Sequence, residues 1–235
     1  VLRTSMELGG NDPFIVCEDA DIAAAVDGAM IAKMRNGGQA CTAANRFYVH
    51  EKIYDEFAAA MTARMSSLVV GDGLADTTQC GPVVSHKQKQ EIASLVDGAL
   101  AQGAKRVSGD PSAMPAKGSF YPPTVLVDVP KDSQIAQHEI FGPVAPLIKV
   151  SSDEEALALA NASEFGLIGY IYTKDLAKGL RLSAKLQTGM VGLNRGLVSD
   201  PAAPFGGMKE SGLGREGGFE GIDEFLETQY VAVEW

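Results

Sequence analysis

Three cysteines are the strongest nucleophiles available to this 235-residue chain, and their settings differ. Cys41 follows Gly37-Gly38-Gln39-Ala40, so it lies on a flexible loop where a thiol can meet a substrate and nearby backbone amides. Cys17 ends an apolar run, which favours a structural role, and Cys80 is a weaker candidate for catalysis than Cys41. A free thiol is mostly protonated at neutral pH, so Cys41 needs a nearby base or a positive environment to attack. From the residues alone, a catalytic and a structural role for Cys41 both stay open.

The composition excludes several other classes of function. The cysteines form no CxxC pair and show no zinc-ligand spacing, so we expect neither a disulfide framework nor a metal site, and a reducing, cytoplasmic compartment. The net charge of -10, without a Lys/Arg cluster, argues against a nucleic-acid or acidic-membrane surface. No apolar run approaches the roughly 18 residues of a membrane span. The chain starts at Val1, so a leader could have been lost with whatever preceded it.

Strand-like and helix-like segments alternate along the chain and must position the Cys41 loop. Apolar, β-rich runs lie at residues 14–17, 46–50, 144–150, 167–172 and 190–193, and helix-period segments follow the first four at 22–34, 53–68, 154–162 and 176–186. This βαβ pattern predicts an α/β fold with an open, mostly parallel, doubly wound sheet. Short polar side chains at 19–21, at Ser85 and at 151–153 are predicted to cap helices, and residues 109–118 to form an exposed loop.

The C-terminal residues 225–235 alternate weakly between apolar and polar side chains, and no helix-period segment follows them. We therefore predict a final strand. It would pair within its own sheet or supply an edge to another subunit.

Five motifs spread over the whole chain resemble those of one enzyme family. Glu7 in Glu7-Leu8-Gly9-Gly10 precedes Cys41 in Gly38-Gln39-Ala40-Cys41 by 34 positions. The further matches are Glu139-Ile140-Phe141-Gly142-Pro143-Val144, Pro204-Phe205-Gly206-Gly207-Met208-Lys209 and Ser211-Gly212-Leu213-Gly214-Arg215-Glu216. The sequence resembles the catalytic C-terminal half of the NAD(P)-dependent aldehyde dehydrogenases.

This resemblance implies a division of labour among the motif residues. Cys41 would add to the aldehyde carbonyl, hydride would pass to NAD or NADP, and Glu7 would activate the water that hydrolyses the thioester. Glu139 would hold the nicotinamide ribose, with Phe141 packed beside the ring and Gly9 also at the cofactor. The backbone N–H of Cys41 would be one oxyanion donor, while the family's second donor, an Asn, belongs to a preceding half.

The resemblance also suggests a substrate. Phe205 corresponds to a wall of the aldehyde pocket, and Arg35 and Ser199 match positions that in succinate-semialdehyde dehydrogenases bind the distal carboxylate. An Arg six residues before Cys41 is a natural carboxylate clamp, and a solvated or helix-end Arg is the alternative. Ala43 stands where some members carry a second Cys, so a redox switch by that route is excluded.

These observations divide the chain into a catalytic domain, residues 1–224, and an oligomerisation strand, residues 225–235, of a homo-oligomeric dimer or tetramer. No GxGxxG follows a strand, so the dinucleotide-binding N-terminal half is expected to lie outside this chain, and NAD and NADP stay equally open. A catalytically silent folding or oligomerisation fragment is the alternative from another class. Glutaric semialdehyde or a CoA-acylating reaction is the alternative within the family, although Glu7 favours hydrolysis.

Overall fold

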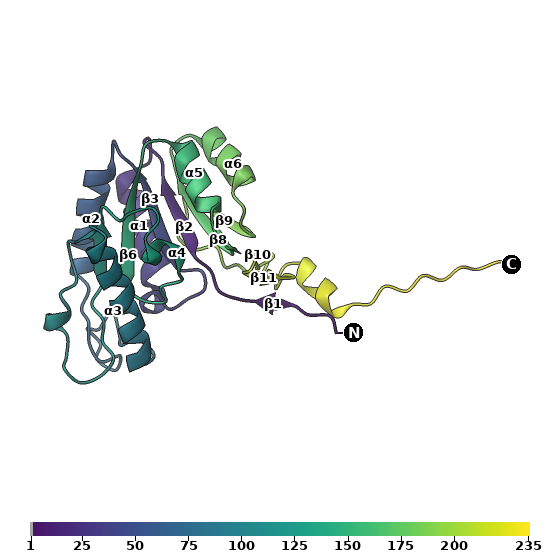
Figure 1. Cartoon of the computed structure of the whole chain (residues 1–235). Coiled ribbons are helices and arrows are strands. Elements are labelled where there is room, and N and C mark those ends of the chain that lie inside the picture. The colour runs from purple at the N-terminus through teal and green to yellow at the C-terminus, as the bar shows by residue number, and fades with distance from the viewer. Residues whose placement is uncertain (1) are drawn as a thin grey trace.

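A seven-stranded sheet with helices on both faces forms the body of the computed structural model, which describes residues 2–235 (Figure 1). The strand order is β4-β5-β6-β3-β2-β8-β9, and every neighbouring pair is parallel except β4 with β5. The predicted open, mostly parallel α/β sheet is confirmed. Its strands are β2 (Asp12–Val16), β3 (Ala44–His50), β4 (Lys105–Arg106), β5 (Thr124–Val127), β6 (Val144–Val150), β8 (Ile168–Tyr172) and β9 (Met190–Leu193).

Two helical layers bury the sheet, one on each face. Along β2, Phe14 and Val16 contribute to one apolar core while Ile15 contributes to the other, as the two-residue period of a strand requires. Helices α1 (Ile22–Met34) and α2 (Tyr54–Ser66) close the first core. The second core is closed by α3 (His86–Ala101), α4 (Gln134–Gln137), α5 (Asp153–Asn161) and α6 (Leu176–Lys185).

The predicted helix starts are confirmed by side-chain caps. Asp21 accepts a hydrogen bond from the N–H of Ala24 at the start of α1, and Ser85 accepts one from Gln88 at the start of α3. Ser152 caps α5 in the same way. Each cap satisfies an amide donor that the first helical turn leaves free. The exposed loop at 109–118 is also present, interrupted only by a short 3-10 turn at Pro111–Ala113.

Two pairs of very short strands were not predicted. β1 (Met6–Glu7) pairs antiparallel with β11 (Gly212–Leu213), and β10 (Met208–Lys209) pairs with β7 (Phe165–Gly166). Two residues carry no period that a sequence pattern could reveal. The β1–β11 pair nevertheless matters, because it sets Glu7 opposite Gly212 and beside the segment that follows β11.

The predicted strand at 225–235 is wrong for the single chain. A 3-10 helix, Glu220–Phe225, includes its first residue, and the remaining described residues to Trp235 are exposed, form no strand and extend away from the body (Figure 1). A strand needs a hydrogen-bonded neighbour, and none of the described residues supplies one. Pairing with another subunit stays a prediction. No helix in residues 2–235 has both the length and the apolar character needed to cross a membrane.

Candidate active site

The motif residues gather at one edge of the sheet, where the chain enters three adjacent strands. Gly9 and Gly10 precede β2, Cys41 precedes β3, and Glu139 precedes β6. The amino ends of parallel neighbours lie at the same edge, so these three loops meet in space although Glu139 is far from the others in sequence. The sheet topology therefore assembles the site.

The loop that carries Cys41 is held in a conformation that depends on glycine. Helix α1 ends at Met34, and the backbone then turns through positive φ angles at Asn36, Gly37 and Gly38 (50°, 61° and 77°). A Cβ atom on Gly38 would lie 2.2 Å from the carbonyl oxygen of Gly142, so a larger residue does not fit there. The side chains of Asn36 and Gln39 each donate to the other's carbonyl oxygen, at 3.0 Å in both directions, which closes the loop.

Cys41 is half-buried, and its surroundings are acidic. Burial raises the pKa of its thiol, and the carboxyl groups of Asp12, Glu7 and Glu139 raise it further. Of the two ways to activate the thiol, these surroundings offer a base and not a positive environment. Directly after the cysteine, the Thr42 carbonyl oxygen accepts a 2.7 Å hydrogen bond from the Tyr170 hydroxyl, which ties the loop to β8.

Glu7 has a carboxyl group that is ready to take a proton. Both of its carboxyl oxygens are buried and have no hydrogen-bond partner among residues 2–235. Burial raises the pKa of Glu7, Glu216 raises it further, and Arg215 opposes both. A desolvated carboxyl with a raised pKa and unoccupied oxygens suits a general base. The negative charge of this carboxyl group also raises the pKa of the Cys41 thiol.

Glu139 is held against the two glycines of the first motif. The backbone N–H of Gly10 donates to Glu139 Oε1 at 3.1 Å, and a Cβ atom on Gly9 would lie 2.8 Å from Glu139 Oε2. A Cβ atom on Gly10 would lie 2.5 Å from the Cys41 carbonyl oxygen. Gly10 therefore needs glycine, because a side chain would push against the backbone of the Cys41 loop, whereas a side chain on Gly9 would meet only the end of the flexible Glu139 side chain.

Phe141 adopts a backbone conformation that is rare for a bulky residue. Its φ angle is 50°, in the left-handed region. The Gln88 side chain donates to the carbonyl oxygens of Ile140 and Phe141, at 3.1 and 3.2 Å, and so holds this turn. Strain of this kind persists where the surrounding structure enforces it, often at functional sites.

Of the three residues predicted to bind the substrate, two are exposed and one lines a hollow. Arg35 lies exposed just after α1 and forms no salt bridge within residues 2–235. Its positive charge opposes the burial that raises the pKa of Tyr170, whose hydroxyl contacts the Cys41 loop. Ser199 is exposed, and the structure brings it into no hydrogen bond with the other predicted residues. Phe205 exchanges two 2.7 Å backbone hydrogen bonds with Glu216 and lines a hollow of about 210 Å³, together with Met190, Val198 and Pro204.

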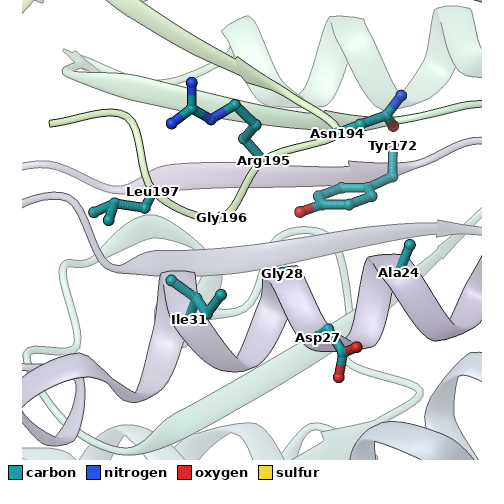
Figure 2. A pocket seen from close by; sticks show the side chains of 9 residues that line it. All are labelled: Ala24, Asp27, Gly28, Ile31, Tyr172, Asn194, Arg195, Gly196 and Leu197. Atoms are coloured by element: carbon teal, nitrogen blue, oxygen red, sulfur yellow. The ribbon is translucent and has the colours of Figure 1, made fainter. Parts of the chain in front are cut away.

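A second hollow, of about 390 Å³, lies between α1 and residues 194–197 (Figure 2). Ile31 and Leu197 line it from these two segments. Ile31 is one helical turn before Arg35, and Leu197 is two residues before Ser199. The hollow therefore lies between the segments that carry the two predicted carboxylate-binding residues. The sequence pattern gave no sign of it.

Cys80 lies close to the loop that carries Cys41, although the two cysteines are far apart in the sequence. A Cβ atom on Gly37 would lie 3.7 Å from Cys80 Sγ. The three cysteines are nevertheless free thiols in this structure, and Cys17 and Cys80 are buried. Ala43 still excludes the switch that a second cysteine at that position would provide.

Two ionisable residues below the site were missed. Asp12 and Lys33 are 1% and 0% exposed, Asp12 raises the pKa of Cys41, and Lys33 lowers the pKa of Glu139. The available signals were weak: one acidic residue at the start of an apolar run, and one lysine within an alanine-rich helix. A pattern of single residues does not show which side chain faces the core.

Known proteins similar to this chain agree with the motifs. The family described as "Aldehyde dehydrogenase family" matches residues 1–231. The succinate-semialdehyde dehydrogenase of Paenarthrobacter nicotinovorans is 51% identical over 99% of this chain and 52% of its own length. The glutarate-semialdehyde dehydrogenase of Pseudomonas putida is 45% identical over 99% of this chain and 48% of its own length. The NADP(+) succinate-semialdehyde dehydrogenase of Escherichia coli is 43% identical, again over 99% and 48%.

Solved structures give the same result. An aldehyde dehydrogenase from Brucella melitensis biovar abortus superposes with a TM-score of 0.94 at 46% identity, over 97% of this chain and 47% of that one. An NAD+ complex of an aldehyde dehydrogenase from Bacillus cereus superposes with a TM-score of 0.91 at 38% identity, over 95% and 45%. This chain spans about half the length of the relatives it matches. The match over residues 1–231, the relatives and the shared fold together place this chain in the aldehyde dehydrogenase family.

Proposed function

We propose that this chain is the catalytic part of an NAD(P)-dependent aldehyde dehydrogenase that oxidises a semialdehyde, with succinic semialdehyde as the preferred substrate. The observation that carries the proposal is that Gly10, three residues after Glu7, lies against both other loops: its N–H donates to Glu139 Oε1 at 3.1 Å, and a Cβ atom on it would lie 2.5 Å from the Cys41 carbonyl oxygen. Relatives named for both succinate and glutarate semialdehyde support an aldehyde with a distal carboxylate.

The residues present fit the nicotinamide end of a dinucleotide. Glu139 keeps a carboxylate oxygen, Oε2, beside Gly9, where the missing Cβ leaves space. We assign Glu139 to the ribose hydroxyls and Phe141 to the ring, with Gly9 as the surface between them. When bound, NAD or NADP accepts the hydride.

In the first half-reaction, the Cys41 sulfur attacks the aldehyde carbon. The thiol proton passes to Glu7 or to solvent, a C–S bond forms, and the carbonyl electron pair moves to oxygen, where the Cys41 N–H stabilises it. The oxyanion collapses, the carbon loses hydride, and a thioester remains on Cys41. In the second half-reaction, Glu7 removes a proton from water, the water oxygen attacks the thioester, and the Cys41 thiolate leaves with its electron pair.

For the substrate, we assign Phe205 to the wall of the aldehyde pocket and Arg35 with Ser199 to the distal carboxylate. The exposed Arg35 guanidinium, free of salt bridges within residues 2–235, supports this assignment. A charged clamp is also the simplest way for a protein of net charge -10 to attract an anion.

The test is NAD(P)H formation from succinic semialdehyde by the full-length protein. Cys41→Ala should abolish it, while Cys17→Ala and Cys80→Ala should retain it. Labelling of the folded protein with iodoacetamide, followed by peptide mapping, should modify Cys41 first. Faster modification of Cys17 or Cys80 would refute the nucleophile assignment. No NAD(P)H from the folded wild type would favour the silent fragment, and NAD(P)H formation only with added CoA would indicate the CoA-acylating reaction.

We also propose that residues 226–235 pair with a second copy of the chain. Their exposed, alternating side chains support an edge that another subunit completes. Light scattering of the full-length protein should give a dimer or tetramer, and a variant that ends at Phe225 should dissociate. An unchanged mass in the shortened variant would contradict this pairing.

A further inference from the structure

A buried tyrosine on β8 reaches the segment that joins Cys41 to β3. Tyr170 is 2% exposed, and its hydroxyl donates a 2.7 Å hydrogen bond to the carbonyl oxygen of Thr42, a residue that is 6% exposed. Burial raises the pKa of Tyr170, so the hydroxyl keeps the proton that it donates. Any buried hydroxyl needs a partner, and here the partner is the residue directly after the proposed nucleophile.

The neighbouring strands hold the Tyr170 ring in place. Phe14 on β2 and Gly192 on β9 stand opposite Tyr170 in the sheet. The ring centroids of Phe14 and Tyr170 are 5.7 Å apart, and a Cβ atom on Gly192 would lie 3.0 Å from Tyr170 Cδ1. The ring is therefore packed between residues of two strands, and its hydroxyl has little freedom to move.

The peptide unit between Thr42 and Ala43 is held at both of its polar atoms. Its carbonyl oxygen accepts the hydrogen bond from Tyr170, and its N–H donates to the carbonyl oxygen of Ala40 at 3.0 Å. The second bond closes a turn over residues 40–43, in which Cys41 is the first central residue. The turn that carries the thiol is thus attached to the core of the sheet through Tyr170.

This attachment lies on the side of Cys41 that faces β3, where the regular strand starts only at Ala44. On the other side, Gly37 and Gly38 precede Cys41 with φ angles of 61° and 77°, and glycine moves easily between backbone conformations. A side-chain anchor after Cys41 restricts the movement that these glycines would otherwise permit.

We propose that Tyr170 is a positioning residue, whose hydroxyl fixes the turn at residues 40–43 so that the sulfur and the N–H of Cys41 keep their places relative to the aldehyde carbonyl. This inference rests on the proposed role of Cys41 as the nucleophile. Tyr170 acts through the peptide unit after Thr42 and contacts no reacting atom. Precise placement accounts for much of the rate of such an attack, because the reacting atoms must be closely aligned.

The first test is Tyr170→Phe in the full-length protein, which removes the hydroxyl and keeps the ring. In rapid-mixing kinetics with saturating cofactor and succinic semialdehyde, the rate constant of the NAD(P)H burst should fall roughly fivefold to fiftyfold, since a small misplacement of the nucleophile is enough. The dissociation constant of the cofactor, measured by calorimetry, should stay unchanged, because the contact between Gly10 and Glu139 does not involve Tyr170.

Tyr54→Phe is the matched control for lost stability. Tyr54 is also 2% exposed, and its hydroxyl donates to the Leu147 carbonyl oxygen at 3.0 Å and accepts from the Asp128 N–H at 2.8 Å. Both variants should melt at a lower temperature, because each loses buried hydrogen bonding, but only Tyr170→Phe should slow the burst. Replacement of Tyr170 by 4-aminophenylalanine, whose amino group can donate to Thr42 from the same place, should recover most of the rate. Equal burst rates in Tyr170→Phe and Tyr54→Phe would overturn the proposal.

A second measurement needs no turnover. Because the Cys41 thiol is half-buried, a looser turn should expose it, and iodoacetamide should label Cys41 about twofold to fivefold faster in Tyr170→Phe than in the wild type or Tyr54→Phe. An unchanged labelling rate would refute the role of Tyr170 in fixing the turn. If labelling accelerates but the folded wild type forms no NAD(P)H, Tyr170 does fix the turn and the proposed function of Cys41 is what fails.

Discussion

The proposed cofactor side and substrate side of the site are built differently. On the cofactor side, Gly9 and Gly10 approach Glu139 and Cys41 so closely that a Cβ atom would lie 2.8 and 2.5 Å from their oxygens. On the substrate side, Arg35 and Ser199 are exposed, and neither side chain is held by a salt bridge or hydrogen bond within residues 2–235. Tight packing therefore surrounds the residues proposed to do the chemistry, while the residues proposed to recognise the substrate lie on exposed segments.

This contrast has a physical consequence for substitution. An atom added at a packed backbone contact forces the neighbouring residues to move, because a packed core cannot take up extra volume without strain. An exposed side chain can be exchanged with little effect on folding. Relatives named for succinate semialdehyde, glutarate semialdehyde and 3-sulfolactaldehyde are 45–51% identical to this chain, as expected if the substrate side varies around a constant cofactor side.

The largest effect should come from Glu7, the proposed general base. Glu7→Gln keeps the shape but removes the base, so thioester hydrolysis should slow by about two to four orders of magnitude. Hydride transfer should slow less, because the thiol can also lose its proton to solvent. Rapid-mixing kinetics should show a burst of NAD(P)H followed by slow turnover. A lost burst with normal hydrolysis would contradict this role.

Gly10→Ala tests the packing of the cofactor side. The new Cβ atom would lie 2.5 Å from the Cys41 carbonyl oxygen and 2.9 Å from Asp12 Oδ1. We expect a loss of about 1–3 kcal/mol in the free energy of unfolding and weaker cofactor binding. Gly98→Ala is the matched control: it lies in α3, nothing stands within 4 Å of its added Cβ, and it should stabilise the protein by up to about 1 kcal/mol. Equal denaturation curves for the two variants would refute the packing argument.

Arg35→Leu tests the substrate side. Removing a charge-assisted hydrogen bond of about 1.5–3 kcal/mol should lower kcat/KM for succinic semialdehyde roughly tenfold to hundredfold. Butanal, which has no carboxylate, should lose little, so the ratio of the two kcat/KM values separates recognition from general damage. If both substrates suffer equally, Arg35 instead supports the Cys41 loop.

Ser199→Ala should shift the same ratio in the same direction by less. A neutral hydrogen bond contributes about 0.5–1.5 kcal/mol, which corresponds to roughly a twofold to tenfold change. The melting temperature should not change, because Ser199 is exposed. A shift as large as that of Arg35→Leu would mean that the serine has a second role.

The smallest effect concerns pH. Glu216 raises the pKa of Glu7, so Glu216→Gln should lower that pKa and leave Glu7 ionised in more acidic solution. The acidic limb of the hydrolysis rate should therefore move to lower pH, with little change on the plateau. Single-turnover hydrolysis across a pH series measures it. A move to higher pH would contradict the electrostatic account.

Much of the fold could be predicted from local sequence signals. The strands at 144–150 and 190–193 were placed correctly as short apolar runs, and the helix at 22–34 as an alanine-rich segment that follows the capping residues at 19–21. The two-residue strands β1 and β11 are too short to give such a signal, and the predicted strand at 225–235 does not form within this chain.

The sequence by itself determined the candidate nucleophile and base, since the motifs around Cys41 and Glu7 identify them by residue type and spacing. Only the tertiary structure decided their environment. Parallel pairing brings Glu139 to the Cys41 loop from almost one hundred positions away, and the same packing buries Asp12 and Lys33 below it. The pKa of a group depends on every charge and solvent boundary around it, and these are properties of the folded arrangement that no local pattern of residues contains.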